Sequence, residues 1–582
     1  MKSKKTKSAL GTLAALAIGL TSSFISTVSL AAEKPNILFL FADDFRWDSF
    51  GYMNKFEVET PNLDKLAERS VNFTKSYNTT AICQGSRAVY ATGMYEYRTG
   101  TNFAHGAMDK NTWDKTYYHR LKNNGYYTGM LGKLGFHILN EKGKKAHHDI
   151  VTPSFDYWGA WLGQGKYDMD KNKEADAWFD HFEGKNEHST HALGVMANDF
   201  IRKAAKQDKP FALQISFKAP HGPYAVDDRY KSVYADTKFS KPEDYGYDKN
   251  APDQPMSGRP QRLGEKWLQE KHYNKNMAGY HGLIYGMDVA IGSIFDELEK
   301  QGVADNTIVI FAADNGHFNG GRGYSGKLYA YEAGARSPTY IYDPRNPAKG
   351  KFTKTSVLTG SIDIAATIYD YTGVKPPADM HGKSLVPALT QIAQGKTPKD
   401  NIAHDSILLM QVWGEATAQS LSVVTPEAKY IHWFYGGTNR DGKKFERAEE
   451  LYVVEKDPQE RNNLAANPEH KKLLASMHEK YDMHLARWDK EQWVAPETFD
   501  EKSKDHGYGK YVTLADRTIE FTSNDKCAIE LMDNKKCGQS GKKKKKNKKN
   551  KDKKVKKDKK EKKNKRKNPG GKKVAEETET AS

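Results

Sequence analysis

The chain has 582 residues, more than one ordinary hydrophobic core holds, so we expect a large domain with appended segments. Its formal net charge of +17 arises mainly in residues 541–582, where 21 Lys and Arg face 6 Asp and Glu. This segment has no aromatic residue, which argues against a specific nucleic-acid domain and predicts a disordered arm that can bind polyanions.

The N-terminus has the pattern of a bacterial secretory signal peptide. Four lysines precede the apolar stretch 9–20, and Ser29-Leu-Ala31 follows as a small-residue cleavage pattern. We therefore predict a signal peptide over residues 1–31 and a secreted or periplasmic protein. No later apolar stretch is long enough to predict a transmembrane segment in the mature protein.

Two short apolar runs, 36–42 and 307–313, are predicted to be buried strands of a parallel sheet. The first ends at Asp43-Asp44 and the second at Asp314-Asn315. Open α/β sheets place their sites at the carboxyl ends of strands. Three carboxylates and one amide oxygen form an oxygen-rich cation site that suits calcium, with magnesium as the alternative.

The segment Cys83-Gln-Gly-Ser-Arg87 lies between these two pairs of oxygen ligands. Residues 86–92 are predicted to form a short helix, which places Cys83 near a helix N-terminus in a positive field. The other cysteines, Cys527 and Cys537, could close a small loop in an oxidising compartment. Cys83 would then be a lone thiol, which is unusual in an exported protein unless it is modified.

The rest of the chain alternates predicted strands and helices, which indicates a largely parallel sheet. Further strands are predicted over 126–131 and 211–217, and an amphipathic helix over 287–298. From residue 401 the pattern changes to short antiparallel strands, over 421–424, 430–435 and 451–454, and then a helix over 471–488. We therefore divide the chain into residues 33–400, a C-terminal subdomain 401–500, an extension 501–540 and the tail 541–582.

Taken together, the motifs resemble those of the type I, formylglycine-dependent sulfatases, in particular secreted bacterial polysaccharide sulfatases. The resemblance runs from about Pro35 to Trp488 and is carried by eight segments: Ala42-Asp-Asp-Phe-Arg-Trp-Asp48, Thr60-Pro-Asn-Leu-Asp-Lys-Leu66, Cys83-Gln-Gly-Ser-Arg87, Gly132-Lys133, Ser216-Phe-Lys-Ala-Pro-His221, Ala313-Asp-Asn-Gly316, Gly326-Lys327 and Glu450-Leu-Tyr452. It implies an α/β sandwich resembling alkaline phosphatase, with a central mostly parallel sheet and a smaller C-terminal α+β subdomain. It also implies that a maturation enzyme oxidises Cys83 to formylglycine (3-oxoalanine). Gly85 departs from the family pattern, which has Pro or Ala there.

The resemblance also implies roles for individual residues. Cys83 in its modified form would be the nucleophile and would complete the metal site of Asp43, Asp44, Asp314 and Asn315. Lys133 and Lys327 match the two sulfate-binding lysines of the family. His221 matches the general acid that protonates the leaving alcohol, and Arg87 matches the residue that orients position 83. The family's second histidine aligns with Gly135, so the nearby His137 is the candidate base that deprotonates the remaining hydroxyl. Lys218 matches no clear family role.

The implied reaction is hydrolysis of a sulfate ester, with a sulfated polysaccharide or oligosaccharide as the expected substrate. Two alternatives stay open: a phosphomonoester or phosphonate hydrolase on the same scaffold, and an inactive, polyanion-binding relative in which Gly85 blocks maturation. The aromatic stretch 155–161 is predicted either to stack on sugar rings or to pack in the core.

Overall fold

The computed structural model describes residues 34–102, 107–144, 148–247, 266–346, 351–411, 420–433 and 448–494, and also residues 252, 264, 497 and 498. The chain divides into two units, 1–34 and 35–582, and every described residue except Lys34 belongs to the second. The predicted signal peptide, the extension 501–540, the tail 541–582 and the Cys527–Cys537 loop lie outside the described residues.

The centre of the second unit is a sheet of eight strands in the order β11-β2-β10-β9-β1-β8-β5-β7. Their bounds are β1 (Asn36–Asp43), β2 (Val71–Phe73), β5 (Tyr127–Lys133), β7 (Tyr157–Trp161), β8 (Phe211–Pro220), β9 (Thr307–Ala313), β10 (Tyr340–Tyr342) and β11 (Thr353–Thr355). Among these strands, β10 alone runs antiparallel to its neighbours. The predicted mostly parallel sheet is therefore confirmed.

Helices cover both faces of this sheet because successive side chains of each strand point to opposite faces. On β1, Leu38 and Leu40 pack with one group of helices, whereas Ile37 and Phe39 pack with another. The first group is α1 (Pro61–Glu68), α8 (Ser189–Ala204) and α11 (Glu270–Lys300), and the second is α2 (Cys83–Thr92), α5 (Tyr117–Asn123), α13 (Asp363–Thr372) and α14 (Val386–Ala393). Each of these buried aliphatic or aromatic side chains stabilises the fold by about 1.5–3 kcal/mol.

Shorter elements connect this framework. There are two small two-stranded sheets. One pairs β3 (Ser76–Tyr77) with β12 (Thr359–Gly360), and the other pairs β4 (Met108–Asp109) with β6 (Ile138–Leu139). The remaining short α-helices are α3 (Glu96–Thr99), α4 (Lys110–Trp113), α6 (His148–Val151), α7 (Phe179–Phe182) and α12 (Glu332–Ala335). The helix predicted over 287–298 is the C-terminal part of the much longer α11.

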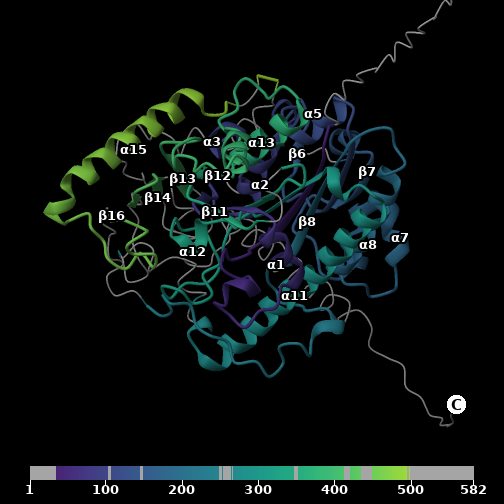
Figure 1. Cartoon of the computed structure of the whole chain (residues 1–582), viewed down its shortest axis with the longest axis horizontal. Helices are drawn as coiled ribbons and strands as arrows, with labels where there is room; N and C mark the ends of the chain where they lie inside the picture. The colour runs from purple at the N-terminus through teal and green to yellow at the C-terminus, as the bar shows by residue number, and fades with distance from the viewer. Residues whose placement is uncertain are drawn as a thin grey trace, which may run out of the picture. The chain divides into compact units, whose positions relative to one another are not determined.

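A separate four-stranded antiparallel sheet lies towards the C-terminus, as the change of pattern after residue 401 predicts. It consists of β13 (Ile407–Gln411), β14 (Ser420–Val424), β15 (Lys429–Trp433) and β16 (Ala448–Tyr452), and α15 (Lys471–Glu491) packs against it (Figure 1). Strand β13 is not among the three predicted strands. It is buried along its whole length, as are the predicted strands β14 and β15, so burial gives no reason for this omission.

The aromatic stretch 155–161 belongs to the core. Tyr157–Trp161 is the edge strand β7, and Phe155, Tyr157, Trp158 and Trp161 all expose less than a tenth of their surface. The core-packing interpretation is therefore confirmed, and stacking of these rings on sugar is wrong. Within the described residues, the structure contains no helix with the length and apolar character needed to cross a bilayer.

Candidate active site

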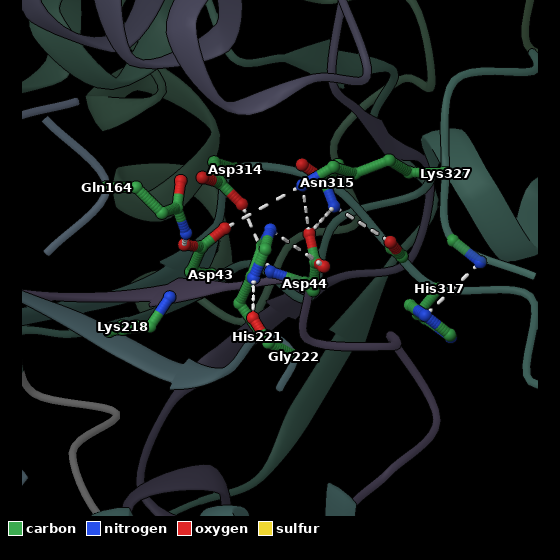
Figure 2. Close-up of polar contacts among 12 residues, drawn as sticks. Asp43, Asp44, Gln164, Lys218, His221, Gly222, Asp314, Asn315, His317 and Lys327 are labelled. Carbon is green, nitrogen blue, oxygen red and sulfur yellow. Dashed lines mark hydrogen bonds and ion pairs between the residues drawn. The ribbon is translucent and has the colours of Figure 1, made fainter. Parts of the chain in front are cut away.

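The two pairs of oxygen ligands meet at the carboxyl edge of the central sheet (Figure 2). Strands β1 and β9 are parallel neighbours with Ala42 opposite Ala313, so the residues that follow them lie side by side. The amide of Asp44 donates to Asp314 Oδ1 at 3.2 Å, and Asn315 Nδ2 donates to Asp44 Oδ1 at 2.7 Å. The residues predicted to bind a metal through oxygen are thus brought together and buried.

Each carboxylate of this group forms a close ion pair with a different basic side chain. Lys133 Nζ lies 2.6 Å from Asp43 Oδ2, Arg87 Nε lies 2.8 Å from Asp314 Oδ2, and Lys327 contacts Asp44 Oδ1. Burial makes an unpaired charge costly, so pairing of this kind stabilises the charged forms. The predicted residues Arg87, Lys133 and Lys327 therefore all reach the same site from three separate elements of the chain.

These pairs shift the ionisation of the carboxyl groups in different directions. Burial opposes ionisation of Asp43, but Lys133, His221 and Lys327 hold its pKa well below the usual value. For Asp44, His221 and Lys327 outweigh burial and lower the pKa to about 2. Burial and the neighbouring Asp43 charge instead raise the pKa of Asp314 to about 6. Of the three carboxyl groups, Asp314 therefore retains its proton to the highest pH.

Cys83 is the first residue of α2 and is buried at 5% exposure. The helix begins three residues earlier than predicted, so Cys83 lies at the N-terminus itself, where the helix dipole favours negative charge. Arg87 follows one turn later on the same helix, and its Nη1 also donates to the Lys133 carbonyl at 2.7 Å. The Cys83 and Asp44 charges both raise the pKa of Lys327 against the opposing effect of burial, which indicates that the thiol lies close to this lysine.

Gly85, the departure from the family motif, is closely packed. A Cβ atom at this position would lie 2.9 Å from Thr80 Cγ2 and 3.0 Å from Glu96 Oε2. Alanine or proline would force these side chains to move, whereas glycine fits without adjustment. The surroundings of α2 thus supply a structural reason for glycine in the folded chain.

Gly135, which stands at the position of the family's second histidine, is constrained by Arg87. It adopts a φ of 91°, and a Cβ atom there would lie 2.3 Å from Arg87 Cδ. A histidine side chain therefore does not fit beside this arginine. His137 lies two residues later, directly before β6, where its carbonyl accepts from the Met108 amide at 2.8 Å. Its catalytic role stays a prediction.

His221 follows β8 and faces the carboxylate pair. Its Nε2 lies 3.7 Å from Asp44 Oδ2, and its Nδ1 lies 2.5 Å from the Gly222 carbonyl oxygen, so Nδ1 carries the proton. Burial lowers the pKa of His221 to about 4, although Asp44 and Asp43 oppose the shift. The imidazole is therefore neutral at pH 7 in the substrate-free site.

The site has the oxygen atoms that a hard cation requires. Asp43 Oδ1 and Asn315 Oδ1 are both buried, and neither has a hydrogen-bond partner among the residues that the structure describes. A cation would satisfy both atoms and would favour full ionisation of Asp314. A second set of possible metal ligands is Asp43, Asp44 and His221, whose ligand atoms lie within 4.8 Å of one another.

Two neighbours of the site were not predicted. Gln164 Nε2 donates to Asp43 Oδ2 at 3.1 Å, and its Oε1 accepts from Lys133 Nζ at 2.7 Å. His317 is buried, and its Nε2 accepts from the Gly326 amide at 3.2 Å, next to Lys327. Its position three residues after Asp314 is a signal that could have identified it, whereas Gln164 lies in a loop without any motif.

Comparisons with known proteins agree with this arrangement. Residues 35–374 match the sulfatase family, and residues 320–486 match the family described as N-sulphoglucosamine sulphohydrolase, C-terminal. The chain is 26% identical over 500 residues to an N-acetylglucosamine-6-O-sulfatase of Bacteroides thetaiotaomicron, covering 76% of this chain and 84% of the relative.

Solved structures share the fold. One, a protein in complex with its substrate D-glucosamine-2-N,6-O-disulfate, superposes with a TM-score of 0.65 at 23% identity, covering 79% of this chain and 99% of that one. Another, the phosphonate monoester hydrolase of Agrobacterium radiobacter, gives a TM-score of 0.61 at 20% identity, covering 78% and 96%. Because the family match spans more than half of the chain and the catalytic edge of the sheet, this protein belongs to the sulfatase family and is a sulfuric ester hydrolase.

Proposed function

We propose that this protein is an exported sulfatase that removes sulfate esters from a sulfated carbohydrate and uses formylglycine at position 83. The observation that carries the proposal is the set of three ion pairs between carboxylates and basic side chains beside a cysteine at the N-terminus of α2. The sulfated amino sugars named for the relative and for the structural neighbour support a carbohydrate substrate.

Each group of the site has a chemical task in this proposal. Formylglycine supplies a hydrated aldehyde, in which one hydroxyl attacks sulfur and collapse of the other releases sulfate. Lys133 and Lys327 bind the anionic sulfate and stabilise the charge that develops on its oxygens. Arg87 orients residue 83, and Asp43, Asp44, Asp314 and Asn315 would hold calcium, with magnesium as the alternative. The cation supplies positive charge that favours ionisation of the nucleophile.

In this proposal His221 donates a proton to the leaving oxygen, and His137 accepts one from the remaining hydroxyl. Since the imidazole of His221 is neutral in the substrate-free site, it must gain a proton when the anionic substrate binds. The added negative charge of a sulfate ester favours this protonation, because it stabilises the imidazolium.

The first prediction concerns His221→Gln. We expect kcat/KM for a sugar or alkyl sulfate to fall about 100-fold or more, because an alkoxide leaving group needs the proton. For 4-nitrophenyl sulfate, whose phenolate leaves without protonation, we expect a fall of less than about 10-fold. Steady-state kinetics on both substrates measure this difference. Equal losses on both would contradict the role of general acid.

The main rival function is a phosphomonoester or phosphonate hydrolase, which a solved structure with this fold represents. A parallel assay on 4-nitrophenyl sulfate and 4-nitrophenyl phosphate separates the two functions, and we expect a preference for the sulfate ester. The other rival is an inactive, polyanion-binding relative. Mass spectrometry of the peptide around residue 83 tests it, since an unmodified thiol in all native protein would leave no nucleophile of the proposed kind.

The second prediction concerns the lysine-rich tail, which we propose binds a polyanion outside the cytoplasm after export through the predicted signal peptide. Truncation after Ser540 is expected to leave turnover of a small aryl sulfate unchanged and to weaken retention on a sulfated polysaccharide column at low salt. The difference should disappear as salt rises, because exposed charges are screened beyond about 10 Å at 0.1 M salt. Equal retention of both proteins across the salt series would leave only a solubilising role.

A further inference from the structure

At the edge of the candidate active site, Lys218 is a buried cation with no carboxylate partner among the residues that the structure describes. Its side chain is almost fully buried, at 3% exposure, and among the described residues no ion pair or side-chain hydrogen bond involves its Nζ. The three carboxylates nearby are each matched by Arg87, Lys133 or Lys327. Lys218 is therefore the cation left over when the charges of the site are paired.

The backbone of β8 directs Lys218 towards the site through an irregularity in the sheet. Phe41 pairs with Ser216 and Asp43 pairs with Pro220, so β8 uses two more residues than β1 over the same interval. Lys218 lies in the middle of this bulge. Bulges next to active sites re-aim side chains, and this one brings Lys218 beside the end of β1.

Tyr167 holds this bulge in place. Its hydroxyl donates to the carbonyl oxygens of Lys218 and His221, at 3.2 and 2.7 Å, and the Lys218 ammonium lies 5.2 Å from the centre of its ring. The ring attracts the cation but leaves the three N–H donors of the ammonium free to bind an anion. The lysine is thus built into a rigid position with unused donors.

Lys218 lies on the side of the site away from Lys327, with the Asp43–Asp44 pair between them (Figure 2). An anion on Lys218 would therefore sit to one side of the sulfur that undergoes attack.

We propose that Lys218 binds a second acidic group, a carboxylate or a further sulfate, on the same sugar that carries the sulfate ester to be hydrolysed. This inference rests on the proposed function, since it assumes a sulfated sugar in the site. Lys218 then determines specificity: it favours substrates with two acidic groups and contributes little to those with one.

Calorimetric titration tests this role separately from turnover. The titrated proteins are Cys83→Ala, which lacks the proposed nucleophile, and the same protein with Lys218→Met, which removes the charge but keeps the length of the side chain. The titrants are inorganic sulfate, glucosamine 6-O-sulfate and glucosamine 2-N,6-O-disulfate. We expect Lys218→Met to lower the affinity for the disulfate by about 10- to 100-fold, which is the effect of one charge-assisted hydrogen bond. The affinities for inorganic sulfate and for the monosulfate should fall by less than about 3-fold.

Two control variants accompany this titration. Lys203→Met removes a lysine that also lies 5.2 Å from a tyrosine ring, that of Tyr157, but sits outside the site, and it should change no affinity. Lys218→Arg should restore part of the affinity for the disulfate. Unchanged binding of inorganic sulfate shows that the Lys218→Met protein remains folded around the site.

Three results would overturn the inference. An equal loss of affinity for all three titrants would show that Lys218 binds the sulfate group that is cleaved. Unchanged binding of the disulfate, or a disulfate that binds no more tightly than the monosulfate when Lys218 is present, would remove its role in recognition. The proposed function fails by a different result, namely absence of sulfate ester hydrolysis by the protein with Cys83 intact.

Discussion

Replacement of Cys83 by alanine is expected to abolish sulfate ester hydrolysis and to leave the protein folded. The proposed nucleophile derives from this side chain, and loss of a covalent nucleophile should lower kcat/KM by at least about 10³-fold. The side chain is small and begins a helix that is held along its whole length by buried contacts, so the fold should tolerate the loss of one sulfur atom. Steady-state kinetics on an aryl sulfate and a thermal unfolding curve measure the two effects.

A matched control and a chemical readout complete this experiment. Cys527→Ala makes the same substitution outside the motif and should retain activity. Mass spectrometry of the peptide that contains residue 83 should find the aldehyde in active protein from the native host. Active protein with only free thiol, or a Cys83→Ala protein that keeps its activity, would contradict the formylglycine assignment. The close packing around Gly85 makes this measurement the direct test of whether the departure from the family motif permits maturation.

Removal of the Asp314 charge is expected to remove the bound cation and the activity together. Asp314→Asn is the preferred variant, because it keeps an oxygen near Arg87, whereas Asp314→Ala would leave that buried guanidinium unpaired at a cost of about 3–5 kcal/mol in stability. The metal content of the purified protein should fall from about one ion per chain to near zero. We expect kcat/KM to fall about 100-fold or more, since the cation supplies charge stabilisation at the nucleophile.

His221→Gln distinguishes the two possible ligand sets for this cation. If the ligands are oxygen atoms from Asp43, Asp44, Asp314 and Asn315, the glutamine variant should keep its metal. Loss of metal in that variant would favour the grouping of Asp43, Asp44 and His221. After chelation, calcium should restore activity at lower concentration than magnesium, because the larger ion accepts a flexible carboxylate-rich site. Full activity in metal-stripped enzyme would refute the metal assignment altogether.

The sequence alone was sufficient to predict the centre of the fold and to name most of the residues that meet at the candidate site. The strands that end at Asp43 and Asp314 are short, apolar and bounded by polar residues, so local pattern identifies them, and parallel neighbours must end at the same edge. Lys133 and Lys327 were named through the resemblance to the sulfatase family, because a single lysine carries no local signal of its own. The C-terminal sheet was predicted in part: β14, β15 and β16 were expected, whereas β13 was not.

Only the tertiary structure decided which charges pair and which one is left over. The three ion pairs join residues between 90 and 283 positions apart, and no local pattern states that Lys133 meets Asp43 while Lys218 meets no carboxylate of the described part of the chain. The two extra residues in β8 depend on the register with β1, which sequence periodicity does not reveal. Pairing follows from distances of a few ångströms between distant segments. Local sequence determines the segments, whereas their packing determines those distances.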